Sequence, residues 1–345
     1  MSTTTRRDTP AVESTPLRAT RGGRWLELAT RQEALLIVVF AIMVTVFSIL
    51  NPRYFSTASF GNIMQDFAPV MLMAIGQTFV IVTGGIDLSV GAVLGLSGVS
   101  AALTIRATTA NGMDPSLSIA AGIGMALLVG VLVGVINGLL VTRVNLAPFI
   151  ATLATMGACM GTTLVVTGGV QIAGAPAEVV EIGNTRYLDI FTAPLLVALV
   201  ILVVAAVVLS KTRFGRHTYA IGSNVFAARV AGINVKRHLM KVYVLGGVLA
   251  SIAGLFVYFR LGSGSPASGR GGELQAIAAA VIGGVSLMGG LGRVTGAALG
   301  ALITASVLSG LILIGVEPNA QQIVVGALIA VAVAVQGIGR SNAGS

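Results

Sequence analysis

The side chains that could do chemistry in this chain are few and widely separated. Cysteine occurs once, at Cys159, and the two histidines, His217 and His238, lie in one basic segment with no carboxylate close in sequence. A lone cysteine excludes an intrachain disulfide and a cysteine-based metal site, and the histidines do not favour a metal site either. The chain contains no Gly-x-x-x-x-Gly-Lys-Ser/Thr loop for nucleotide hydrolysis. We therefore expect no catalytic residues, no bound metal and no enzymatic activity.

The composition places the chain among membrane proteins with several spans. Of the 345 residues, 55% are hydrophobic and 10% are charged, and the mean hydropathy is +0.94. The 45 glycines suit helices that pack closely through small faces. These values exclude a soluble enzyme, a disordered protein and a collagen. We predict an all-α polytopic membrane protein.

Apolar runs, divided at charges, prolines and polar clusters, predict about ten transmembrane helices. They cover residues 34–50, 70–83, 90–105, 119–141, 149–166, 192–209, 242–259, 275–288, 294–314 and 320–336. Several are shorter than the roughly 20 residues that a straight span needs. Such segments are tolerated where protein or a polar cavity satisfies the backbone. An alternative with eight spans treats the short runs around Gly84 and Gly290 as re-entrant.

The basic residues predict the orientation. With ten spans and the amino terminus inside, 16 of the 21 Lys and Arg residues lie on the inner side, as the positive-inside rule requires. This topology explains the net charge of +9, so no nucleic-acid partner is expected. We predict a transmembrane domain over 34–336, a disordered basic cytoplasmic tail over 1–33 and a cytoplasmic tail over 337–345. The loop 210–241 is predicted to be cytoplasmic, and residues 168–189 to face outward.

The middle of the cytoplasmic loop 210–241 has the pattern of a short amphipathic helix. Residues 224–233 combine Phe226, Val230 and Ile233 with a glycine cap at Gly232. The seven basic residues of the loop, with no acid among them, are explained by topology and by attraction to anionic lipid headgroups. The apolar residues instead require a surface to dock against.

Asp87 is the only acid that these boundaries place near a span interior. An intramembrane carboxylate is a hypothesis for a functional site, but Asp87 also precedes an apparent helix start, where it could act as a cap. We favour the cap and keep substrate contact as the alternative. The neutral polar residues of the spans suit a neutral, hydroxyl-rich cargo. The candidate translocation path is therefore Gln77, Asp87, Ser89, Asn137 and Thr152.

Two glycine-led segments resemble each other. Gly-Gly-Ile-Asp-Leu-Ser at 84–89 and Gly-Gly-Glu-Leu-Gln at 271–275 each lead into a run rich in Gly and Ala. One hypothesis is an inverted repeat of two four-helix units with a path near their interface. The alternative is chance similarity in a glycine-rich chain.

An ordered series of motifs resembles the permease subunits of bacterial ABC-type sugar importers of the ribose/xylose class, within the wider branched-chain amino acid permease superfamily. The series covers about residues 33–336. It comprises Gly-Gly-Ile-Asp-Leu-Ser-Val-Gly at 84–91, Asn-Gly at 137–138, Pro-Phe-Ile-Ala-Thr-Leu at 148–153, Thr-Arg-Phe-Gly-Arg at 212–216, Ala-Ile-Gly-Ser-Asn at 220–224, Ala-Ile-Ala-Ala at 276–279 and Gly-Gly at 283–284.

The resemblance implies a permease in the bacterial cytoplasmic membrane that works as two copies with a cytoplasmic ATPase and a periplasmic sugar-binding protein. ATP-Mg would be bound by the ATPase, and no cofactor by this chain. The family's ATPase-docking segment falls on Asn224, Phe226, Ala227, Ala228, Arg229, Gly232 and Ile233. Phe226 stands where the family often has an acid, which puts a polar contact there in doubt. The rival functions are a branched-chain amino acid-type ABC permease and an ion-coupled secondary transporter. The sequence does not identify the sugar.

Overall fold

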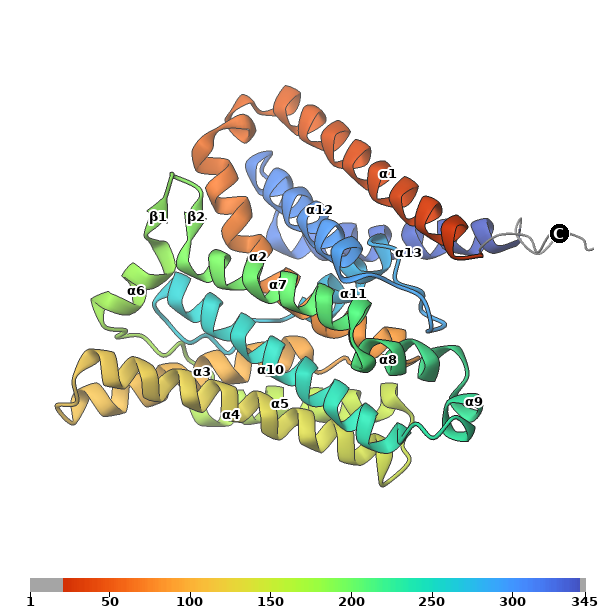
Figure 1. Ribbon diagram of the computed structural model, residues 1–345. Coiled ribbons are helices and arrows are strands. Elements are labelled where there is room, and N and C mark those ends of the chain that lie inside the picture. The colour runs from red at the N-terminus through yellow and green to blue at the C-terminus, as the bar shows by residue number, and fades with distance from the viewer. Residues whose placement is uncertain (1–20, 342–345) are drawn as a thin grey trace, which may run out of the picture.

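The computed structural model describes the backbone of residues 21–341 and the side chains of residues 33–317 and 320–334. Within that part the chain is almost wholly helical, as predicted (Figure 1). The long helices are α1 (Arg21–Leu50), α2 (Thr57–Val82), α3 (Val90–Ala110), α4 (Pro115–Thr142), α5 (Pro148–Thr167), α7 (Ala193–Lys211), α10 (Val235–Leu261), α12 (Val294–Leu313) and α13 (Pro318–Ser341). The shorter elements are η1 (Pro52–Phe55), α6 (Ala177–Asn184), the antiparallel strands β1 (Arg186–Tyr187) and β2 (Phe191–Thr192), α8 (Arg213–Ser223), α9 (Val225–Val230) and α11 (Gly272–Ile282).

Each predicted span coincides with a helix, but some boundaries differ. Eight helices of the described chain are long and apolar enough to cross a membrane, while α11 and the apolar stretch Ala320–Ala334 are shorter. The sequence prediction starts the second span at residue 70, whereas α2 begins at Thr57 and contains Pro69 within the helix. It ends the eighth span at 288, whereas α11 stops before Gly283 and Gly284, and Gly284 has a φ of 85°. α1 begins at Arg21, so the predicted tail is helical from there, and residues 1–20 lie outside the described part.

The two ends of the bundle differ in character. α8 and α9 lie at one end, and α6 with the β1–β2 hairpin lies at the other (Figure 1). Asp66 of α2 pairs with Arg260 of α10 near the hairpin end, whereas the end of α2 packs on α8 through Val82 and Gly222. α2 and α10 therefore run antiparallel. Because α8 and α9 belong to the acid-free basic loop, the positive-inside rule predicts that their end is cytoplasmic.

The pattern of packing supports the inverted repeat. α10 contacts α3 and α4, and α2 contacts α11 and α12 in the same way. α3 packs on α4 and α5, as α11 packs on α12 and α13. The unit α2–α5 thus corresponds to the unit α10–α13, and the antiparallel α2 and α10 give the units opposite directions. The two similar segments fall at comparable places, since 84–89 immediately precedes α3 and 271–275 forms the N-cap and first turn of α11.

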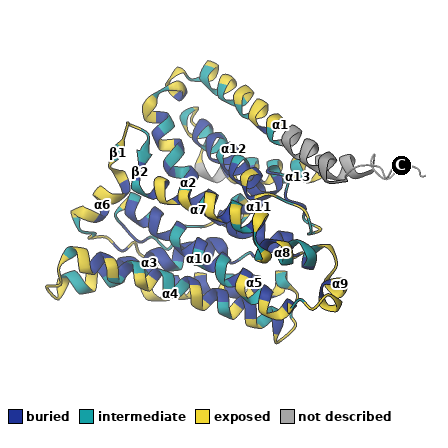
Figure 2. Ribbon diagram, in the orientation of Figure 1, coloured by how far each residue is buried: buried dark blue, intermediate teal, exposed yellow. Residues whose placement is uncertain are grey.

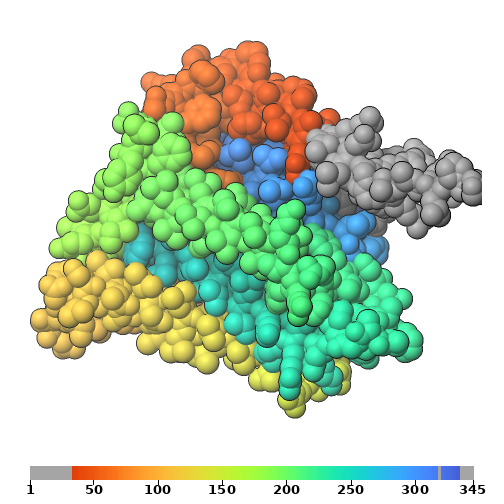
Figure 3. Space-filling view, viewed as in Figure 1, coloured from red at the N-terminus to blue at the C-terminus, as the bar shows by residue number. Residues whose placement is uncertain are grey.

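The core lies around α2 and α10, whose small residues allow close backbone approach. A Cβ on Gly76 of α2 would lie 3.2 Å from the Cα of Gly246 in α10, and one on Gly134 of α4 would lie 2.7 Å from the main chain of Tyr243. On the face of the molecule shown in Figure 3, α10 lies between α7 and α4, which leave little of it exposed. Figure 2 shows exposed residues along α1, α4 and α7, where large apolar side chains such as Ile37, Leu132 and Val203 face outward. These faces suit lipid rather than water.

Candidate translocation site and docking surface

Two helices begin inside the bundle rather than at its surface. The turn before α3 contains Gly84 at a φ of 84°, and the residue before α11 is Gly271 at a φ of 74°. A Cβ on Gly272 would lie 3.4 Å from the Cε of Met73, near the middle of α2, so α11 starts about halfway through the membrane. Its 11 residues rise about 16 Å, roughly half of the apolar core.

The starts of α3 and α11 lie against each other. Cβ atoms on Gly91 and Gly95 would come within 2.5 Å of the carbonyl oxygens of Gly269 and Ser268, respectively. Only residues without side chains permit this approach. Two broken helices from opposite repeats therefore meet at mid-depth, and their positive N-terminal ends share one region. Transporters of other folds bind their substrates in such places.

Two cavities flank this meeting point. One of about 370 Å³ is enclosed by the start of α3, by α5, by α11 and by α13, and its polar side chains are Thr163, Ser268, Arg270, Glu273 and Gln322. The other, about 260 Å³, lies on the further side of Gly269 and Arg270 and also contains Asp66, Gln275, Ser309 and Gln321. A third, about 430 Å³, shares Asp66 and Ser309 with the second and reaches Arg53 and Arg260 at the outer end. Together they form a series of polar cavities in the outer half.

The expectation that Asp87 is the only acid near a span interior is therefore wrong. α11 begins at Gly272 rather than at residue 275, which brings Glu273 into its first turn at mid-depth. Glu273 is half-buried and borders the larger cavity. Glu273 follows Gly271 and Gly272 in the segment that resembles 84–89, where Asp87 follows Gly84 and Gly85. This similarity could have identified Glu273 from the sequence.

The predicted path residues come together in one buried cluster below the start of α3. The Thr155 hydroxyl donates to Oδ1 of Asn137 at 2.6 Å, and the Asn137 amide donates to the Ser89 hydroxyl at 2.8 Å. The Ser89 hydroxyl and main-chain N–H both donate to Oδ1 of Asp87, at 2.6 and 2.8 Å. This series of hydrogen bonds ends at the carboxylate of Asp87, a residue that is 1% exposed. None of the predicted path residues lines any of the three cavities described above.

Gln77 and Thr152 complete this cluster by bonding the main chain of the turn. With its amide nitrogen facing the Asp87 carbonyl, Gln77 donates to that oxygen at 3.1 Å and accepts from the Asp87 N–H at 3.2 Å. The Thr152 hydroxyl accepts from the Leu88 N–H at 3.1 Å. Side chains of α2 and α5 thus satisfy an irregular backbone within the membrane, where no water can do so. The expectation that Asp87 caps the helix after it is wrong, because α3 begins at Val90, Ser89 holds the N-cap position, and the Asp87 carboxylate accepts the Ser89 N–H just before the helix.

Helix α9 has the cap and turn geometry that the sequence predicts for residues 224–233. The side chain of Asn224 accepts from the Ala227 N–H at 2.9 Å, and Gly232 has a φ of 83° with the Ile233 N–H bonded to the Ala228 carbonyl at 3.0 Å. Ala228 packs inward, whereas Phe226 and Val230 are each 75% exposed. Ile233 differs from the expectation because it packs toward the small core under α9 rather than outward.

Helix α8 connects this surface to both broken helices. Gly222 packs against the Val82 carbonyl oxygen at the turn before α3, closely enough that any Cβ would overlap it. The same carbonyl accepts from the Gly290 N–H at 2.9 Å, in the turn after α11. The Tyr219 hydroxyl donates to the Gly292 carbonyl at 2.6 Å. A displacement of α8 therefore acts on both turns.

Comparison with known proteins identifies the family. The family described as branched-chain amino acid transport system / permease component matches residues 59–333. The ribose import permease protein of Bacillus subtilis is 44% identical over 294 residues, which cover 85% of this chain and 88% of that protein. The Escherichia coli K12 D-allose transport system permease protein is 39% identical (86% and 89% covered), and the Rhizobium meliloti fructose import permease protein is 36% identical (87% and 83%). No solved structure matches this chain. The chain is therefore a multi-pass membrane protein of the branched-chain amino acid transport system permease family, and these relatives within that family are named as sugar permeases.

Proposed function

We propose that this chain is the translocating subunit of an ATP-driven importer for a monosaccharide. The relatives named for ribose, D-allose and fructose transport, each matched over most of its length, carry this proposal. The antiparallel repeats and the broken helices that meet at mid-depth are consistent with it. The chain itself would catalyse no reaction, since ATP-Mg would be bound and hydrolysed by a separate cytoplasmic ATPase.

Docking of the ATPase would involve α9. A side chain as large as Phe226, 75% exposed beside Val230 on a cytoplasmic helix, gains stability when a partner covers it. The site would comprise Asn224, Phe226, Ala227, Ala228, Arg229, Gly232 and Ile233. Asn224 and Gly232 would hold the helix in shape, Arg229 would supply a charge, and Ala228 and Ile233 would anchor α9 to the protein.

Coupling would run from α9 through α8 to the two turns. α8 contacts the turn before α3 through Gly222 and the turn after α11 through Tyr219. Closure of two ATPase subunits on two permease copies would shift α8 and, with it, the facing helix starts. The path would then open alternately to each side.

The cargo would be a neutral molecule rich in hydroxyl groups, to which the cavities offer charged as well as neutral hydrogen-bonding side chains, among them Arg270. Glu273 and the amides Gln275, Gln321 and Gln322 offer hydrogen-bond acceptors and donors next to the facing helix starts. Gln77, Asp87, Ser89, Asn137 and Thr152 would support this region from the cytoplasmic side. At the outer end, the cavity that contains Arg53, Asp66 and Arg260 would receive the sugar from a periplasmic binding protein.

Uptake by the reconstituted complex tests the proposal. The full chain would be placed in liposomes with its ATPase, and the cognate binding protein would present radiolabelled ribose. ATP-dependent uptake that unlabelled pentoses or hexoses inhibit is the expected result. Absence of ribose uptake together with ATP-dependent uptake of a radiolabelled branched-chain amino acid would favour the branched-chain amino acid rival. Uptake that needs an ion gradient and no ATP would favour a secondary transporter.

A further inference from the structure

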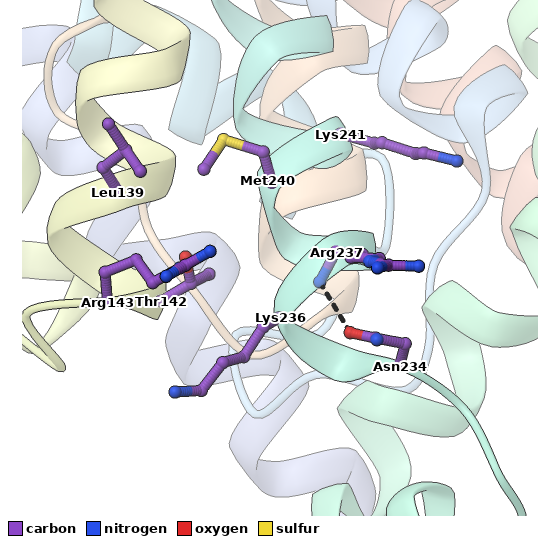
Figure 4. A pocket seen from close by; sticks show the side chains of 8 residues that line it. All are labelled: Leu139, Thr142, Arg143, Asn234, Lys236, Arg237, Met240 and Lys241. Atoms are coloured by element: carbon purple, nitrogen blue, oxygen red, sulfur yellow. Dashed lines mark hydrogen bonds between the residues drawn. The ribbon is translucent and has the colours of Figure 1, made fainter.

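A cavity with a mostly apolar wall, bordered by basic residues, separates α4 and α10 at their cytoplasmic ends. It has a volume of about 550 Å³, and it is lined by Leu139, Thr142, Arg143, Asn234, Lys236, Arg237, Met240 and Lys241. Further up, the two helices pack tightly, and a Cβ on Gly138 would lie 3.2 Å from the Cα of Met240. Below this contact the helices part. Figure 4 shows Arg143 and Lys236 between α4 and α10, whereas Arg237 and Lys241 extend from the other side of α10.

No ion pair within the described residues involves the charges at this cavity. Among residues 33–317 and 320–334, the ion pairs are Arg260 with Asp66 and Arg293 with Glu33, neither of which lies here. Lys236 and Arg237 also occupy the first turn of α10, at its positive end. Cations there are repelled by the helix dipole, and an anion in the cavity would relieve that repulsion.

The cavity continues into an apolar surface. Leu139 and Met240 form its membrane side, and Leu128, Leu132 and Leu139 follow one another along α4, exposed by 49, 52 and 42%. This spacing places them on one face of the helix. The charged end of the cavity lies at the cytoplasmic ends of the helices, where lipid headgroups are found. The site therefore offers two cations next to a lipid-facing apolar strip.

We propose that Arg143 and Lys236 bind the phosphate of an anionic phospholipid of the cytoplasmic leaflet, with its acyl chains along Leu139, Leu132 and Leu128. A free anion would use the two cations but not the apolar strip. The proposal depends on the membrane orientation of the chain and not on which substrate it transports.

Lipid binding to the purified full-length chain tests this site. The protein would be delipidated in mild detergent and titrated with phosphatidylglycerol or phosphatidylcholine, and bound lipid would be counted by native mass spectrometry. Each basic residue near an anionic surface contributes about 1 kcal/mol. Removing both charges in R143Q/K236Q should therefore weaken phosphatidylglycerol binding by roughly thirtyfold and leave phosphatidylcholine binding unchanged.

Two further variants separate this site from general surface charge. K211Q/R213Q removes the same charge from the same cytoplasmic face away from the cavity, and it should bind phosphatidylglycerol as the unmodified chain does. R143K/K236R retains both charges and should also bind. The proposal is overturned if R143Q/K236Q binds normally, if K211Q/R213Q weakens binding equally, or if inorganic phosphate competes as strongly as the lipid. Displacement of the lipid by the ATPase would show that the cavity is a protein-docking site instead.

Discussion

Replacing Gly222 by alanine should uncouple ATP hydrolysis from transport. Gly222 is the penultimate residue of α8, and it lies against the Val82 carbonyl oxygen. A Cβ added to Gly222 would also lie 2.6 Å from the main-chain nitrogen of Gly290. The added methyl group must push α8 away from the turns before α3 and after α11. α9, whose cap residues are unchanged, should keep its own shape.

The size of the effect follows from three contributions. Overpacking of this kind costs about 1–3 kcal/mol, and disturbing the bond between Gly290 and Val82 costs about 0.5–1.5 kcal/mol. The better helix propensity of alanine offsets about 1 kcal/mol. The net loss is about 2 kcal/mol in the contact between α8 and the two turns. This corresponds to a factor of roughly thirty in the equilibrium constant that couples displacement of α8 to displacement of the turns.

The assay is sugar uptake per ATP hydrolysed by the complex in liposomes. We expect Gly222→Ala to bind the ATPase normally but to transport at least tenfold fewer sugar molecules per ATP, by the same thermodynamic relation. Gly124→Ala is the matched control, because Gly124 is a helical glycine whose Cβ would meet nothing within 4 Å. Normal coupling in Gly222→Ala would refute this route, and so would a transport loss fully explained by loss of the ATPase.

Three other perturbations test topology, docking and the buried cluster. Single cysteines at Ser223 and Glu181, in a Cys159→Ser background, should react with an impermeant maleimide from opposite sides; reaction of both from outside would contradict the orientation. Gly232→Val forces a β-branched residue to a φ of 83°, at a cost of about 1–2 kcal/mol or more. ATPase binding, measured by co-purification, should therefore fall while membrane insertion persists. Unchanged binding would exclude α9 as the docking element. Asp87→Asn keeps an oxygen that can accept both Ser89 bonds and should be mild, whereas Asp87→Ala leaves the buried Ser89 N–H and hydroxyl without that acceptor and should lower the free energy of unfolding by about 1–3 kcal/mol; loss of transport in Asp87→Asn at normal expression would instead indicate contact with substrate or a coupling ion.

Local patterns in the sequence determined the class of the protein and the geometry of the short helix α9. Hydropathy identifies spans because the membrane solvates apolar side chains continuously along a helix, and the distribution of Lys and Arg orients them. The geometry of α9 was predictable because Asn224, Gly232 and the apolar residues between them act within a few residues of one another.

Contacts between distant segments were decided only by the tertiary structure. Asp66 lies within α2, and its carboxylate pairs with Arg260, 194 residues later in the sequence. The short α11 and the position of Glu273 depend on Gly91 and Gly269 lying together, and Asn137 reaches Ser89 across 48 residues. Periodicity describes which face of a helix is apolar but not which helix covers it. The residues that line the central cavities therefore became identifiable only when the two repeats were seen to face each other.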